Sequence, residues 1–374
     1  MGRPRTTPVG NAALAAAIAG TGLSYASIAQ AINRVAAESG TPTSCTAGSL
    51  GKWLNGTLPQ PGTIPLAVEA FSRLLGQSDL TAAGLGWTGP ATAPGDPWHG
   101  DPVAWITRLG KDDMLDRRTA LATGLYSLAA AALPAVPQQM TARSGPARRA
   151  GPSDVTRIRR MGDQFQEMDD LYGGGHGRTT VAAYLVHEVA PLLRGTTGSA
   201  RPGLFTAAAE ITYLLAWMTA DDRRPGLAQR YYIQAARLAD EAGNRLMRAT
   251  ALRSLAVQAI DLGHHQAGHA LAEAAAESAR GAEPRRRAWI TGMRAEALAA
   301  HGHDRQRAHR LLTQAEADLE HADSLPEHDW TGNYRRESYE HQVGLTLAQL
   351  GDYKAAAEHY ALSVTSRRPA EASR

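Results

Sequence analysis

Apolar side chains recur at three- and four-residue steps along most of this chain, which is the pattern of amphipathic helices. Long runs of β-branched residues are scarce, and alanine, leucine, arginine and glutamate dominate, so the sequence predicts an all-α protein. Near the N-terminus, Ile28, Ala29 and Ile32 can pack inward from a helix over residues 23–32. Ser24 is placed to cap that helix.

A second short helix follows, in which Leu50, Trp53 and Leu54 share the inward face. We expect it to begin at Thr46 or Ser49, to follow a lengthened turn over residues 33–44, and to stop near Gly56. This order is that of a helix-turn-helix, whose second helix meets base edges of double-stranded DNA with its N-terminal residues. The residues predicted to contact DNA are therefore Ser24, Thr46, Ala47, Gly48, Ser49 and Lys52.

The first residues of the chain offer a second route to DNA. Gly2-Arg3-Pro4-Arg5 resembles the core of an AT-hook, whose arginines enter a narrow minor groove. Arg3 and Arg5 are accordingly predicted to contact DNA, and a plain N-terminal tail is the alternative.

Beyond residue 153 the chain predicts helix after helix, with polar turns at 221–222, 263–265, 302–304 and 351–353. The units resemble tetratricopeptide repeats with longer helices, and such hairpins must stack to bury their apolar faces, which leaves a concave groove. We therefore predict a helix-turn-helix domain over 1–87 and an array of antiparallel hairpins over 154–374. Between them, residues 88–153 predict Pro/Gly-rich linkers around an apolar helix at about 115–133.

Arginine and aromatic side chains recur on the predicted array helices, where they would suit a peptide carboxylate, a small molecule or an acidic partner. The alternative is that the aromatic side chains are core between repeats and the arginines form surface ion pairs. The residues predicted to line the groove are Trp217, Tyr231, Arg253, Trp289, Arg294 and Tyr334.

Composition and motif content exclude several classes of function. The formal charge of +3 and the pI of about 9.1 are only mildly basic, and the single cysteine, Cys45, excludes a disulfide framework and favours the cytoplasm. No metal-binding, nucleophile or phosphate-loop motif stands out, so we expect neither an enzyme nor a cofactor. The apolar run 120–136 predicts a packed helix and no membrane contact, with a membrane-tethered sensor as the alternative.

Several motifs together resemble a known family. The opening Leu23-Ser24-Tyr25-x-x-Ile28-Ala29, the close Trp53-Leu54-Asn55-Gly56-x-x-Pro59, the junction 172–178 and the helix 184–193 are similar to actinomycete regulators. Those proteins combine an XRE-type helix-turn-helix with a tetratricopeptide-like region.

The resemblance implies a homodimeric transcription regulator, in the manner of peptide-sensing regulators with a similar layout. We expect it in the cytoplasm, associated with the nucleoid, and a dimer must match half-sites one helical turn, ~34 Å, apart. The alternative is a scaffold protein whose helix-turn-helix no longer reads DNA. This alternative is favoured because the second helix has one basic residue, Lys52, to bind phosphate.

Overall fold

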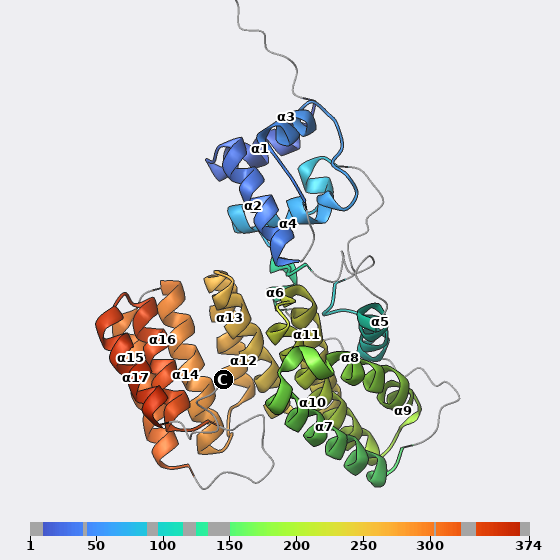
Figure 1. Cartoon of the computed structure of the whole chain (residues 1–374), viewed down its shortest axis with the longest axis vertical. Coiled ribbons are helices and arrows are strands. Elements are labelled where there is room, and N and C mark those ends of the chain that lie inside the picture. The colour runs from blue at the N-terminus through green and yellow to red at the C-terminus, as the bar shows by residue number, and fades with distance from the viewer. Residues whose placement is uncertain are drawn as a thin grey trace, which may run out of the picture.

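The structure, a computed structural model, describes residues 10–39, 43–87, 96–114, 125–133, 150–302, 304–322 and 334–366. Throughout these ranges the regular elements are helices, and no strand occurs, which confirms the all-α prediction. A small N-terminal head stands at one end of the long axis, and the hairpins of the array lie below it (Figure 1).

The head is built around one small core. Ile28 and Ile32 pack with Leu50 and Phe71, and the rings of Trp53 and Trp87 meet edge to face at 5.7 Å. Its helices are α1 (Ala12–Thr21), α2 (Tyr25–Glu38), α3 (Ala47–Leu54) and α4 (Thr63–Leu75), followed by a short 3₁₀ turn (Ala83–Leu85).

The turn between α2 and α3 is shorter than the sequence predicted. Helix α2 continues to Glu38, so the prediction of a turn starting at residue 33 is wrong. Val35 and Ala36 carry on the inward-facing pattern of α2 and are buried in the head core, which stabilises the extra turn and a half of helix.

Residues 96–114, predicted to begin with a linker, contain a packed helix. Helix α5 (Pro102–Met114) buries Val103, Ile106 and Leu109 in the core of the array, together with Trp98 just before it. The predicted apolar helix at about 115–133 lies partly outside the described residues. In the part that is described, only α6 (Leu128–Ala131) is helical.

The array begins with α7 (Pro152–Tyr172), α8 (Gly174–Tyr184), a π-helical turn (Leu185–Val189) and α9 (Ala190–Gly195). Antiparallel hairpins follow, and the turns predicted from the sequence separate the paired helices, as at Gly263 and Gly351, where φ is +80°. The pairs are α10 (Ala200–Asp221) with α11 (Pro225–Ala242), α12 (Arg245–Asp261) with α13 (His265–Ser278), α14 (Pro284–Gly302) with α15 (Arg305–Glu320), and α16 (Arg336–Gln349) with α17 (Tyr353–Ser366).

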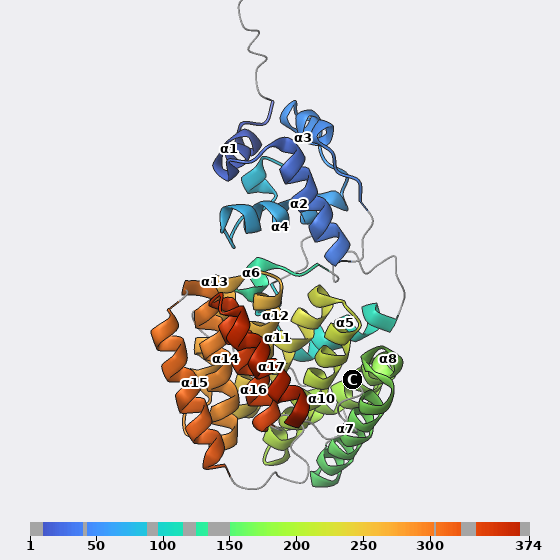
Figure 2. The ribbon, with the colours of Figure 1, turned by 60° about the vertical axis from the view of Figure 1, so that its left-hand side comes forward.

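Residues 125–131, here called the strap, lie between the head and the array in both views (Figures 1 and 2). The Leu125 side chain enters the head core, and the buried Glu69 of α4 accepts hydrogen bonds from the Leu128 amide at 2.9 and 3.1 Å. On the other side, the Gln229 amide of α11 pairs with both backbone groups of Ser127 at 2.8 Å. The strap therefore bonds to both parts of the molecule.

No single helix in the described ranges is long and apolar enough to cross a membrane. The pair α1 and α2 meets that test together by length and composition, with a bend of 92° between the two helices.

Candidate functional site

The N-terminus of α3 is fixed by a reciprocal pair of caps. Thr46 Oγ1 accepts the Ser49 amide at 3.3 Å, and Ser49 Oγ accepts the Thr46 amide at 3.2 Å. Such a capping box satisfies two of the amides that a helix start leaves unpaired. Thr46 and Ser49, both predicted DNA contacts, thus also hold the helix end. Ser24 caps α2 by a single bond, in which its Oγ accepts the Ser27 amide at 3.2 Å.

Asn33, which no sequence pattern singled out, sets the position of α3. Its side-chain amide donates to the Cys45 carbonyl at 2.9 Å and accepts the Cys45 amide at 2.8 Å. Both bonds span the turn between α2 and α3, so the residue just before the α3 cap is tied to the middle of α2. This arrangement fixes how the end of α3 projects from the head.

The outward face of α3 is small and open. With Leu50 and Trp53 buried, the 100° step between successive residues directs Gly48, Lys52 and Asn55 to the opposite side, where all three are exposed. A Cβ at Gly48 would make only an ordinary contact at 3.6 Å, and one at Gly51 would meet nothing within 4 Å. Another surface can therefore approach the α3 backbone closely.

Positive charge on the head is sparse. Residues 10–87 contain three cations, Arg34, Lys52 and Arg73, against three carboxylates. Arg34 and Lys52 are exposed, whereas Arg73 is bound to Glu38 at 2.6 Å and Glu69 at 2.8 Å. Arg3 and Arg5 lie outside the described residues.

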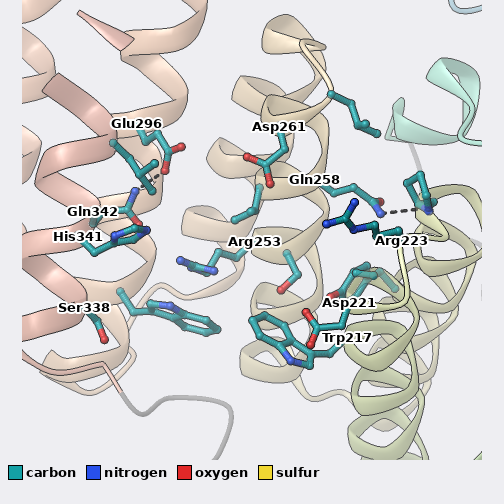
Figure 3. A pocket seen from close by; sticks show the side chains of 18 of the residues that line it. Trp217, Asp221, Arg223, Arg253, Gln258, Asp261, Glu296, Ser338, His341 and Gln342 are labelled. Atoms are coloured by element: carbon teal, nitrogen blue, oxygen red, sulfur yellow. Dashed lines mark hydrogen bonds between the residues drawn. The ribbon is translucent and has the colours of Figure 1, made fainter. Parts of the chain in front are cut away.

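A cavity of about 900 Å³ opens on the inner side of the array. Helices α10, α11, α12, α14 and α16 line it (Figure 3), and the C-terminal end of α2 contributes Ala37 and Glu38. Four of the residues predicted for the groove lie on its wall: Trp217, Arg253, Trp289 and Tyr334. The Arg253 guanidinium stacks over the Trp289 ring at 4.2 Å, and the Trp217 side chain is 46 % exposed.

Two residues predicted for the same groove lie elsewhere. Tyr231 is fully buried on the far side of α11, where its hydroxyl donates to Asp113 of α5 at 3.3 Å, and the neighbouring Tyr232 reaches the cavity instead. Arg294 points toward α13 and binds Glu273 at 2.8 Å. For Arg294, the structure therefore shows the alternative reading, in which the arginine forms an ion pair on the surface of the array.

Carboxylates on the cavity wall were missed by the sequence analysis. Asp261 and Glu296 point toward one another from α12 and α14 (Figure 3), and Asp221 stands beside Trp217. Burial raises the pKa of Glu296 to about 7, against the opposing effects of the Gln342 hydrogen bond and the positive charge of Arg253, and the negative charge of Asp261 adds a smaller rise. The Gln342 amide donates to Glu296. Only the packing of α14 against α12 brings these groups together, so no local motif could have revealed them.

The cavity and the strap meet at one ion pair. Glu38, on the cavity wall, binds Arg73 of α4, and Arg73 also donates to the Tyr126 carbonyl of the strap at 3.2 Å. The Tyr126 ring stacks on His264 at the start of α13 at 5.2 Å, and burial lowers the pKa of His264 to about 4, with the positive charge of Arg73 adding to that effect. Arg73 therefore contacts the cavity wall, the head and the strap.

Comparison with known protein families shows that residues 14–88 match the SP15 N-terminal domain. The matched stretch begins at Leu14, the first core residue of α1, and ends one residue after Trp87, so it coincides with the head. No curated protein and no solved structure matches the chain. Within the described ranges, no cluster of three or more histidine, cysteine, aspartate or glutamate side chains has the geometry to hold a metal ion.

Proposed function

We propose that this protein is a DNA-binding transcription regulator. Its head reads double-stranded DNA through the outward face of α3, and its array, similar to tetratricopeptide repeats, forms a homodimer and receives an effector. The exposed α3 face carries the proposal: the helix start is capped, Leu50 and Trp53 anchor its back, and its front presents only small or polar groups around Lys52. A recognition helix needs this combination to enter the major groove.

The effector cavity supports the second part of the proposal. Its wall includes Ala37 and Glu38 of α2, so a molecule bound there would contact the head directly. An effector can shift an equilibrium only through contacts that differ between two states, and contact with both parts of the chain provides for that. The resemblance to XRE-type regulators with a tetratricopeptide-like region agrees with this division of labour.

The test uses full-length protein and sheared genomic DNA, from which retained fragments are sequenced at two salt concentrations. The regulator is expected to retain a recurrent palindrome at the higher salt. Lys52→Ala is expected to weaken binding and to make the salt dependence shallower, by about 1 in the slope for each phosphate that Lys52 neutralises. Lys354→Ala, which removes an equal charge from exposed α17, is the matched control.

The second candidate function is a scaffold whose head binds a protein and no longer reads DNA. The equal numbers of cations and carboxylates in residues 10–87 favour it, because phosphate binding depends on basic residues. Retention of no sequence, or of all sequences at low salt alone, would support the scaffold and contradict the regulator. Ser49→Ala is less suitable than Lys52→Ala for this test, because it also removes half of the α3 capping box.

A further inference from the structure

The cavity holds buried polar atoms that the protein itself does not satisfy. Among the described residues, Arg253 Nε, the Tyr334 hydroxyl and Gln258 Oε1 have no hydrogen-bond partner, and all three side chains line the cavity. Tyr334 is only 3 % exposed. A buried polar group without a partner is costly, so such groups concentrate where a ligand supplies the missing bonds.

One end of the cavity is suited to an anion. The Arg253 guanidinium is charged, as arginine is throughout the physiological pH range, and it lies over the Trp289 ring. Its Nε has no hydrogen-bond partner in the described part of the chain, so it can donate to a bound acceptor. Burial raises the pKa of Tyr334, so its hydroxyl remains a neutral donor close to Arg253. Two donors, one of them charged, can bind a carboxylate or a similar anion here.

The other end is suited to a cation. Asp261 lies eight residues after Arg253 on α12, and Glu296 lies seven residues after Trp289 on α14. At 1.5 Å per residue, the backbone positions of Asp261 and Glu296 lie ~10–12 Å further along their helices than those of Arg253 and Trp289. Because Glu296 faces Asp261 across the cavity, an ammonium group between them would neutralise two carboxylates that repel each other.

We propose that the cavity binds a dipolar small molecule with an anionic group at Arg253 and Tyr334 and an amino group between Asp261 and Glu296. The residues that bind the two groups are ~10–12 Å apart along their helices, and the positive charge of Arg253 acts on Glu296 across that space. Between the two ends the wall is apolar, because Val257 lines the cavity and lies four residues from both Arg253 and Asp261 on α12, so the body of the ligand is apolar. The inference rests on the proposed function for its regulatory meaning, although the binding site stands on its own geometry.

The test measures binding of three probes to the full-length protein by calorimetry. The probes share a rigid biphenyl body: one carries an aminomethyl group and a carboxylate at opposite ends, one carries two carboxylates, and one carries two aminomethyl groups. The zwitterion is expected to bind at least tenfold more tightly than either matched probe. Arg253→Met is expected to weaken zwitterion binding at least tenfold, and Asp261→Asn to erase most of the advantage over the dicarboxylate.

Arg294→Met is the matched control, because Arg294 occupies a similar place on the next first helix but points to Glu273 on α13. Circular dichroism and the thermal midpoint establish that each variant is folded. Equal binding of the three probes, no binding of the zwitterion at millimolar concentration, or equal losses for Arg253→Met and Arg294→Met would overturn the proposal. No DNA enters this assay, so its failure is separate from failure of the regulator proposal, which the Lys52→Ala measurement decides.

Discussion

The double variant Gly48→Ala/Gly51→Ala separates the stability of α3 from its function. Neither glycine has a positive φ, and the added Cβ atoms would meet Thr46 Oγ1 at 3.6 Å and nothing within 4 Å, respectively. Alanine is better than glycine by about 1 kcal/mol inside a helix, and the gain at Gly48 is smaller because it lies in the first turn. We therefore expect α3 to be stabilised by about 1–2 kcal/mol.

Hydrogen exchange of the α3 amides in the full-length protein measures this gain locally. A stabilisation of about 1–2 kcal/mol slows exchange about 5- to 30-fold where the amides open locally. The same two methyl groups stand on or beside the face that we propose enters the major groove. DNA binding is therefore expected to weaken at least about tenfold, or about 1.4 kcal/mol, although the helix is more stable.

Gly302→Ala, at the exposed end of α14 with nothing within 4 Å of the new Cβ, is the control and leaves DNA binding unchanged. Faster exchange in α3 would refute the reasoning about its open face. Slower exchange with unchanged DNA affinity would leave the helix as described and refute the contact with DNA, in favour of the scaffold.

Two further predictions concern groups that the sequence did not reveal. Glu296 takes up a proton in the folded state at a pKa of about 7 against an ordinary 4.5, so its stabilising effect is fully present below pH 4.5 and is lost as the pH rises through 7. Glu296→Gln removes this pH-dependent loss of folding stability, which amounts to about 3 kcal/mol at most. The thermal midpoints of the variant at pH 5 and pH 8 should then differ less than those of the wild type. Asn33→Ala leaves both backbone groups of Cys45 without their partner, which costs about 1–3 kcal/mol of folding stability. Hydrogen exchange of the amides at the start of α3 should therefore accelerate. Gln30→Ala, an exposed change on the same helix, is the control and should leave this exchange unchanged.

The helical hairpins could be predicted from the sequence because their signals are local. Glycines with positive φ end α12 and α16, and polar residues mark the turns after each first helix. Helix α5 was not predicted because it begins at Pro102, at the end of a proline- and glycine-rich stretch that predicts a linker. Its apolar residues are stabilised by packing on α8 and α11, which are distant in sequence.

The orientation of groove residues could be predicted only in part. Helix α11 has polar side chains at three- and four-residue steps, but Gln229, Gln234 and Arg237 are buried, where they donate to carbonyls of Ser127 and Pro97. The polar face of its sequence therefore does not show which side borders the cavity. Tyr231 and Tyr232 are adjacent and differ by 100° around the helix, and only tertiary packing decides that Tyr232 reaches the cavity. The facing carboxylates Asp261 and Glu296 depend likewise on how α12 and α14 are stacked.

A ligand in the cavity can act on the head by direct contact. Glu38 belongs to the cavity wall and to α2, the helix whose Asn33 side chain holds the start of α3. A positively charged group bound in the cavity beside Glu38 would compete with Arg73 for it. Arg73 in turn supports the strap through the Tyr126 carbonyl, so weakening this ion pair would loosen the head from the array at the place where both are joined. In the dimer that we propose, an effector would thus change the angle of the two heads, and with it the half-site spacing that they match.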